Sequence, residues 1–107
     1  KADFYLSCHL NSLDRQEIGG IESYFFKPED LAPAKAIQQA LLKKLNRQDR
    51  GVRKARFFVL FHTDMPAVLI EPAYFSNEEE YNLLLTESFR EKIAEGVVDG
   101  ILNYYAR

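Results

Sequence analysis

The sequence predicts an α/β domain in which a layered mixed sheet carries helices on both faces. Its strand candidates are short apolar runs with little polar alternation, which is typical of strands that helices cover. Two long segments place apolar residues at helical spacing. The order strand, strand, helix, strand, strand, helix, helix fits a layered fold. The 107 residues, 47% of them hydrophobic, are enough for one core and not for two.

The first half of the chain contains two predicted strands and one predicted helix. Residues 4–8, Phe-Tyr-Leu-Ser-Cys, form the first strand, and a polar loop that ends in two glycines follows it. Residues 21–26 form the second strand, with odd-numbered side chains on one face and even-numbered ones on the other. A helix then begins at Pro28, which suits a first helical turn, and ends near Asn46.

The second half contains two further predicted strands and two helices. Residues 56–61, Arg-Phe-Phe-Val-Leu-Phe, form the third strand, and residues 67–70, Ala-Val-Leu-Ile, form the fourth. Ser76 and Glu79 have the spacing of a capping box, which predicts a short helix to about residue 85. A final long helix begins at Thr86. Its predicted inward stripe consists of Phe89, Ile93, Val97, Ile101 and either Tyr104 or Tyr105.

Four strands leave the predicted sheet incomplete. The first strand begins at residue 4, and strands buried on both faces normally have more neighbours. We therefore expect residues 1–107 to be the C-terminal portion of a single larger domain whose N-terminal strands are missing. An unprotected strand edge invites pairing with another chain, so association through this edge is also expected.

Composition excludes several classes of protein. A formal net charge of −2 argues against a nucleic-acid-binding protein. No apolar run approaches the roughly 18 residues that a membrane-spanning helix needs. A single cysteine allows no internal disulfide.

Two polar residues stand where predicted strands end, which is where chemistry collects in open α/β sheets. His9 follows the first strand and Glu71 follows the fourth. For Glu71 a structural role, such as capping a loop or meeting an arginine, competes with a catalytic one. His9 alone can be a histidine that is merely hydrogen-bonded. Together the two suit a zinc ligand and a general base for bound water.

Two further residues are weaker candidates. Cys8 and His9 are adjacent in a strand and point to opposite faces, so they do not form a nucleophile pair. Cys8 is better explained as a small buried apolar residue. His62 lies in a polar loop before Pro66, either as a surface residue or at the rim of a cleft.

A basic cluster occupies the end of the first long helix and the segment after it. One explanation is a solvated helix end, since cations favour a helix C-terminus. The other is a patch that faces an anionic polymer. The cluster consists of Lys43, Lys44, Arg47, Arg50, Arg53, Lys54 and Arg56.

Three segments in series resemble a known family. They are ADFYLSCHLNS, GGIESYFF and RGVRKARFFVLFHTDMPAVLIEPAYFSNEEE, and together they cover nearly the whole chain. In order and spacing they are similar to the zinc-dependent N-acetylmuramoyl-L-alanine amidases of bacterial cell walls, the type-3 amidases. The resemblance implies a zinc-exopeptidase-like (phosphorylase/hydrolase-like) fold.

The resemblance also implies roles for single residues. His9 corresponds to the last zinc-binding histidine of the family, and Glu71 to its catalytic glutamate. Zinc-activated water would then cleave the amide bond between N-acetylmuramic acid and the L-alanine of the stem peptide. Asn11, just after His9, and His62 are possible substrate-cleft residues. Peptidoglycan is the implied partner, and the implied location is outside the cytoplasm, in the periplasm or cell wall.

The chain also departs from the family pattern. Two further zinc ligands of the family, a histidine in a Gly-His-Gly motif and a glutamate in the next helix, have no counterpart here. We expect them in the missing N-terminal segment, and we expect residues 1–107 alone to be inactive or nearly so. Pro72-Ala73 stands where Thr-Gly is common. No feature of the sequence identifies an activating protein.

Two other functions remain open. A non-catalytic module that binds the cell wall or a partner protein would keep the fold without the metal site. A zinc peptidase of the same fold would act on ordinary peptides. A muropeptide with its sugar intact separates an amidase from a peptidase.

Overall fold

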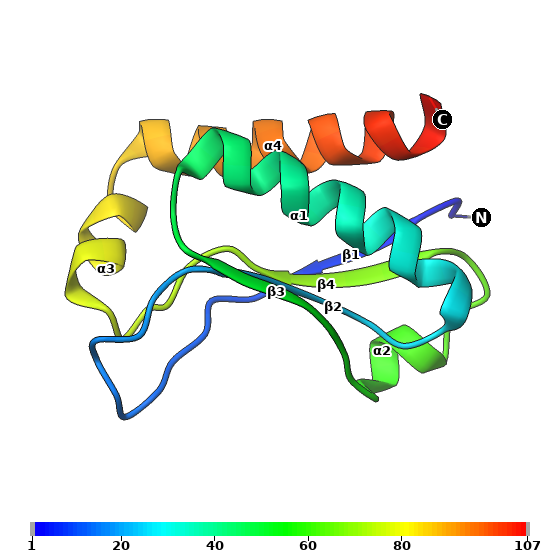
Figure 1. The fold of residues 1–107 in the computed structure, drawn as a ribbon, viewed down its shortest axis with the longest axis horizontal. Coiled ribbons are helices and arrows are strands. Elements are labelled where there is room, and N and C mark those ends of the chain that lie inside the picture. Colours follow the sequence, from blue (N-terminus) through cyan, green and yellow to red (C-terminus); the bar gives the residue numbers. More distant parts are fainter. Residues whose placement is uncertain (1, 107) are drawn as a thin grey trace.

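A computed structural model describes residues 2–106, which form a mixed sheet with helices packed against it (Figure 1). The sheet has the strand order β1-β4-β2-β3. The strands are β1 (Tyr5–Cys8), β2 (Ile21–Phe25), β3 (Asp49–Lys54) and β4 (Ala67–Glu71). The helices are the 3-10 turn η1 (Pro28–Asp30), α1 (Leu31–Leu45), α2 (Phe58–Phe61), α3 (Glu78–Leu84) and α4 (Glu87–Ala106).

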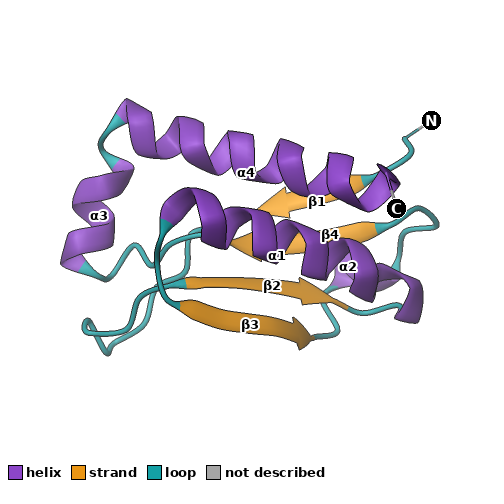
Figure 2. Cartoon of the chain, turned by 45° about the horizontal axis from the view of Figure 1, so that its top comes forward, coloured by secondary structure: helices purple, strands orange, loops and turns teal. Residues whose placement is uncertain are grey.

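The sheet combines parallel and antiparallel pairs (Figure 2). β1 runs parallel to β4, with Cys8 opposite Ile70, and β2 runs parallel to β3. β2 runs antiparallel to β4, which places Glu22 opposite Glu71. The predicted layered mixed sheet is therefore confirmed, with β1 as one of its two outer strands.

Helices α1 and α4 cover one face of the sheet, and the short α2 lies on the other (Figure 1). The main core lies between α1, α4 and the sheet, and its largest members include Ile21, Ile37, Leu41 and Ile70. α4 approaches α1 closely at Gly100, where an added Cβ would lie 2.5 Å from the Cα of Ile37. A smaller cluster of Leu60, Ala67 and Leu69 fills the α2 side.

The predicted third strand over residues 56–61 is wrong. The third strand is β3, Asp49–Lys54, and the apolar run forms the single helical turn α2, Phe58–Phe61. β3 is an edge strand with exposed or half-exposed side chains, so it has no apolar signature. The short apolar run is ambiguous by pattern, because four or five such residues fit a strand or a helical turn equally well.

Two smaller predictions also need correction. Asn77, and not Ser76, is the N-cap of α3, because its side chain accepts a hydrogen bond from the Glu80 backbone N–H. The Ser76 hydroxyl instead accepts from the backbone N–H of Leu13 at 2.9 Å. Cys8 is exposed rather than buried, since β1 lies at the sheet edge.

The predicted long helices are confirmed. The first comprises η1 and α1, and it ends at Asn46, whose φ of 54° is the left-handed conformation common after a helix. Along α4, Phe89 is buried, and Ile93, Val97 and Ile101 pack on the main core. Within residues 2–106, no helix has both the length and the apolar character required to cross a bilayer.

Candidate active site

Two carboxylates face each other across the middle of the sheet. Glu22 of β2 and Glu71 at the end of β4 are paired residues in antiparallel register. Directly opposed residues of an antiparallel pair project from the same face of the sheet. Like charges at such positions repel, so this arrangement requires that the two carboxylates be stabilised differently.

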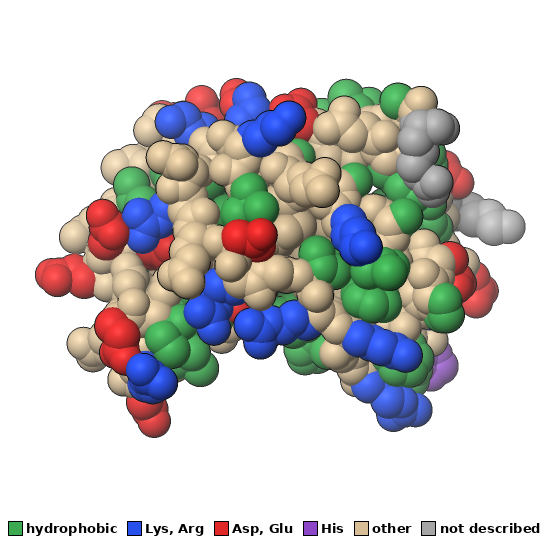
Figure 3. All heavy atoms as spheres, in the orientation of Figure 1, with side chains coloured by type: hydrophobic (Ala, Val, Ile, Leu, Met, Phe, Trp, Pro, Cys, Tyr) green, Lys and Arg blue, Asp and Glu red, His purple; other side chains and the backbone are tan. Residues whose placement is uncertain are grey.

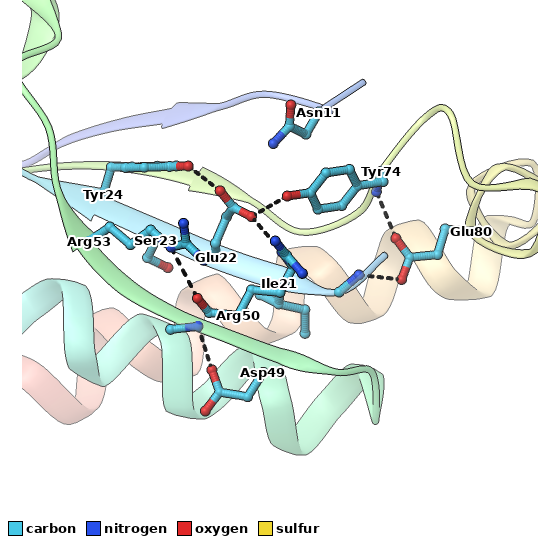
Figure 4. A network of polar contacts seen from close by, with 12 residues as sticks. Asn11, Ile21, Glu22, Ser23, Tyr24, Asp49, Arg50, Arg53, Tyr74 and Glu80 are labelled. Carbon is cyan, nitrogen blue, oxygen red and sulfur yellow. Dashed lines mark hydrogen bonds and ion pairs between the residues drawn. The ribbon is translucent and has the colours of Figure 1, made fainter. Parts of the chain in front are cut away.

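Glu22 is held as a carboxylate by three donors (Figure 4). Its side chain is 2% exposed and accepts hydrogen bonds from the Tyr24 hydroxyl, the Tyr74 hydroxyl at 2.5 Å and Arg50 Nε at 3.2 Å. Burial opposes ionisation, but these hydrogen bonds outweigh it and hold the pKa of Glu22 below its usual value. Glu22 is therefore a fixed negative charge at neutral pH.

Glu71 lacks such donors. Its Oε1 atom is buried, and no hydrogen-bond partner reaches it within the described residues. Burial, followed by the negative charge of Glu22, raises the pKa of Glu71 to about 7. A carboxylate that titrates near neutral pH is matched to proton transfer, and two carboxylates with separated pKa values are a recurring acid–base arrangement.

The strand β1 brings His9 to the same end of the sheet. The His9 backbone N–H donates to the Ile70 carbonyl at 2.9 Å, which continues the β1–β4 pairing. Because Cys8 lies opposite Ile70, one further residue brings His9 level with Glu71. The His9 side chain is exposed. The sheet thus places these two predicted site residues at neighbouring strand ends.

Asn11 lies close to the same network. It pairs with Tyr74 in an isolated bridge, and its backbone carbonyl accepts from the Phe75 N–H at 2.6 Å. Figure 4 shows its side chain on the same side of the sheet as Glu22 and Tyr74. The predicted cleft residue Asn11 therefore borders the carboxylate pair.

His62 lies elsewhere. It caps the C-terminal end of α2, and its ring contacts Phe58 and Phe61 with centroids 4.3 and 5.5 Å away. α2 precedes β4, whereas Glu71 is at the far end of that strand (Figure 1). The structure does not bring His62 together with His9 and Glu71.

The described residues fit a zinc ion only in part. Among residues 2–106, no group of three His, Cys, Asp or Glu side chains is arranged to hold a metal ion. A catalytic zinc takes three protein ligands and a water. The exposed imidazole of His9 suits one ligand position, and the free oxygen of Glu71 suits acceptance of a proton from bound water.

Sequence reasoning missed Glu22 and its donors. The available signal was a glutamate in the second position of a strand that is otherwise apolar or aromatic on that face. It also missed Glu80, which is fully buried and accepts from the backbone N–H groups of Gly20 at 2.8 Å and Tyr74 at 2.7 Å. Arg47 Nε donates to the same carboxylate at 3.0 Å. Glu80 thus joins the loop before β2 to the segment after β4 (Figure 4).

Known proteins show similarity over almost the whole chain. Residues 1–103 match the Amidase_3 family, described as N-acetylmuramoyl-L-alanine amidase. The chain is 32% identical to the probable cell wall amidase LytH of Staphylococcus epidermidis over 106 residues, which are 99% of this chain and 36% of that protein. It is 34% identical to the N-acetylmuramoyl-L-alanine amidase LytC of Bacillus subtilis over 98% of this chain and 22% of that protein. The chain thus spans only a minor part of these relatives.

Solved structures share the fold. The N-acetylmuramoyl-L-alanine amidase AmiC2 of Nostoc punctiforme superposes with a TM-score of 0.94 at 33% identity, over 99% of this chain and 59% of that one. The catalytic domain of the amidase CwlV of Bacillus (Paenibacillus) polymyxa gives a TM-score of 0.93 at 34% identity, over 98% and 59%. The predicted fold class is confirmed by these matches.

Proposed function

The chain belongs to the N-acetylmuramoyl-L-alanine amidase family Amidase_3, and from this premise we propose that residues 1–107 are the C-terminal portion of a single catalytic domain. That domain hydrolyses the amide bond between N-acetylmuramic acid and L-alanine in peptidoglycan. The observation that carries the proposal is Glu71, whose buried oxygen has no partner among the described residues and whose pKa is raised to about 7.

Glu71 is the general base and then the general acid of the reaction. Its free carboxylate oxygen accepts a proton from the attacking water, and the protonated carboxyl later donates it to the leaving amine of L-alanine. A pKa near neutral suits both steps, because the group gains and loses the proton at similar cost. Burial keeps this pKa raised, and the fixed negative charge of Glu22 raises it further.

A bound zinc ion would supply Lewis-acid chemistry at the scissile carbonyl and at the attacking water. His9 would hold it as one ligand, and the other ligands would come from outside the described residues. Asn11, beside the carboxylate pair, orients the substrate, and His62 contributes to a more distant part of the cleft. Residues 1–107 alone are therefore expected to be inactive or nearly so.

The names of the relatives support an extracytoplasmic setting, since LytH is called a probable cell wall amidase. We propose that the whole protein is exported and acts on peptidoglycan in the periplasm or cell wall. No nucleic acid is needed for this role. For residues 1–107 alone, the outer edge of β1 is the expected contact between chains.

The experiment that tests the function uses the whole protein that carries this chain and purified muropeptides with intact sugars. The wild type should release free stem peptide with an L-alanine amino terminus. Glu71→Gln should lower the rate by about 100- to 10,000-fold, the usual contribution of general acid–base catalysis. Glu29→Gln, at an exposed carboxylate in η1, is the matched control and should leave the rate unchanged.

The outcomes separate the competing functions. Hydrolysis that survives Glu71→Gln contradicts the proposed mechanism. Peptidoglycan binding without hydrolysis, indifferent to chelators and to Glu71→Gln, indicates a wall-binding module instead. Cleavage of ordinary peptides but not of the sugar–alanine bond indicates a peptidase of the same fold.

A further inference from the structure

Cations and aromatic rings gather beyond the carboxylate pair, at the end of β3 and on α2. We call this the aromatic–cationic surface, and it consists of Arg53, Lys54, Arg56, Phe57, Phe58 and His62, all exposed. Figure 3 shows Lys and Arg side chains with hydrophobic ones between them along the lower side of the molecule. Between Asp49 and Asp64 the sequence contains no acidic residue.

The basic cluster seen in the sequence divides into two parts in the structure. Lys44, Arg47 and Arg50 form ion pairs with carboxylates, at Glu95, Glu80 and Glu22 among others. These three cations are explained by the fold, and Lys43 is an exposed side chain in the last turn of α1.

The remaining three cations form no ion pair among the described residues, although the charge of Arg53 helps to lower the pKa of Glu22. Arg53, Lys54 and Arg56 form no ion pair with any carboxylate of residues 2–106. Two of them lie over aromatic rings, Lys54 Nζ at 5.5 Å from the centroid of Phe26 and Arg56 at 4.2 Å from that of Phe61. The cations that these rings hold in place present a positive field to solvent.

The aromatic side chains at this surface face solvent rather than the core. Phe58 is 65% exposed and Phe57 40% exposed. Phe58 contacts His62 and Phe61, with ring centroids 4.3 and 5.6 Å away. Exposed aromatic clusters flanked by charged residues are typical of binding sites.

The surface is continuous with the candidate active site through Tyr24. The Tyr24 hydroxyl donates to Glu22, and the rings of Tyr24 and Phe57 pack at right angles with centroids 5.3 Å apart. Tyr24 is also the register partner of Arg53. A ligand bound at Glu71 can therefore extend over Tyr24 to Arg53 on this face of the sheet, and from there to Lys54 and Arg56 at the outer edge of β3.

We propose that the stem peptide of the substrate lies along this path and that its carboxylates contact Arg53, Lys54 and Arg56. The inference rests on the proposed function, which puts the sugar–alanine bond at Glu71. In that substrate the lactyl carboxyl is consumed in the amide bond, so the sugar chain offers no anion to three cations. The peptide, which ends in a carboxylate, is the part whose charge is complementary.

The test measures binding by NMR titration of the isotopically labelled whole protein that carries this chain. The probes are the acidic stem peptide freed from sugar, the same peptide with its carboxylates converted to amides, a sugar oligomer without peptide, and poly(glycerol phosphate). We expect the acidic peptide to shift the signals of residues 53–62, with an affinity that falls as salt rises. The amidated peptide and the sugar oligomer should leave these signals in place.

Charge variants make the test specific. Lys54→Gln/Arg56→Gln should weaken binding of the acidic peptide by about three- to tenfold, the effect of losing two exposed charge pairs. Lys35→Gln/Lys43→Gln removes the same charge from exposed positions of α1 and should have no effect. Lys54→Arg/Arg56→Lys keeps the charge and should bind as the wild type does, which separates charge from any change in folding.

Several results would overturn the inference. These are equal binding of the amidated peptide, sugar oligomer bound at residues 53–62, or poly(glycerol phosphate) bound there in place of the peptide. Binding requires no hydrolysis, so the two proposals fail separately. Normal peptide binding by Lys54→Gln/Arg56→Gln ends this inference while Glu71-dependent hydrolysis stands, and binding without any hydrolysis by the whole protein ends only the proposed function.

Discussion

Glu22 and Glu71 lie opposite each other on neighbouring antiparallel strands, and Glu22 alone is surrounded by hydrogen-bond donors. Tyr24, Tyr74 and Arg50 stabilise its charge, whereas Glu71 has a buried oxygen without a described partner. The pKa of Glu22 is therefore lowered and that of Glu71 raised. Two residues of one chemical type acquire different protonation behaviour from their neighbours alone.

Glu22→Gln should lower the pKa of Glu71 from about 7 toward its ordinary value. The substitution removes the negative charge that disfavours a second carboxylate, while burial still keeps the pKa somewhat raised. Titration of the carboxyl carbon of Glu71 by NMR measures this directly. Glu29→Gln is the control, and a midpoint that stays near 7 in Glu22→Gln would show that burial acts alone.

The raised pKa of Glu71 also makes stability depend on pH. The folded chain holds the Glu71 proton more tightly than the unfolded chain does. The protonated carboxyl therefore adds to the free energy of unfolding in full below about pH 4.5, and this contribution is lost as pH rises to about 7. The loss is on the order of 2 kcal/mol once solvent screening of this half-exposed residue is allowed for. Urea unfolding at pH 4.5, 6 and 7.5 should show this slope in the wild type.

In Glu71→Gln the free energy of unfolding should hardly change between pH 4.5 and 7, because glutamine does not titrate. Glu22 acts in the opposite sense, since its lowered pKa adds stability above its unfolded pKa that is lost as pH falls through the folded one. If Glu71→Gln keeps the full wild-type dependence of the unfolding free energy on pH between 4.5 and 7, another titrating group must cause that dependence.

Glu80→Ala should destabilise the chain by about 3 to 5 kcal/mol, because it leaves Arg47 and two buried backbone donors without their acceptor. Glu79→Ala is a matched control: its exposed carboxylate binds the same arginine at 3.0 Å and should contribute less than about 1 kcal/mol. Denaturant unfolding of both variants compares them. Equal losses of unfolding free energy in the two variants would mean that burial does not make Glu80 more stabilising than Glu79.

His9→Ala should weaken zinc binding by the whole protein by more than the roughly 10- to 100-fold that outer-shell partners contribute. The chain has one other histidine, His62, whose imidazole packs on Phe58 and Phe61. His62→Ala should therefore leave zinc affinity unchanged. Competition with a chromogenic chelator measures both, and equal affinities of the two variants would remove His9 from the metal site.

Apolar patterns in the sequence were sufficient to predict the helices and strands that pack a continuous apolar surface against the core. The run at residues 67–70 and the stripe along α4 are visible because burial demands apolar side chains there, and the half-buried run at residues 4–8 packs Phe4 and Leu6 on the same core. The edge strand β3 was missed because none of its side chains is buried. Its sequence, Asp-Arg-Gly-Val-Arg-Lys, therefore contains no apolar run that would indicate a strand. The apolar run of α2 predicts a strand, because a single helical turn is too short to show a helical period.

The same limit applies to the candidate site. His9 and Glu71 stood out because each is polar directly after an apolar strand. Glu22 did not, since its role depends on donors from separate segments, Tyr74 being 52 residues away along the chain. Such convergence is a property of the folded topology, and no local pattern reports it.

The parallel pairing of β1 with β4 has a consequence for the order in which the chain folds. Tyr5 pairs with Ala67, and these partners lie 62 positions apart along the chain. Closing so long a loop is entropically costly, and it gains little until β2 and α1 already hold β4 in place. β1, and His9 with it, should therefore dock late during folding and detach early during local opening. Amide protons of residues 5–9 should accordingly exchange with solvent faster than those of β4, although both strands share one ladder.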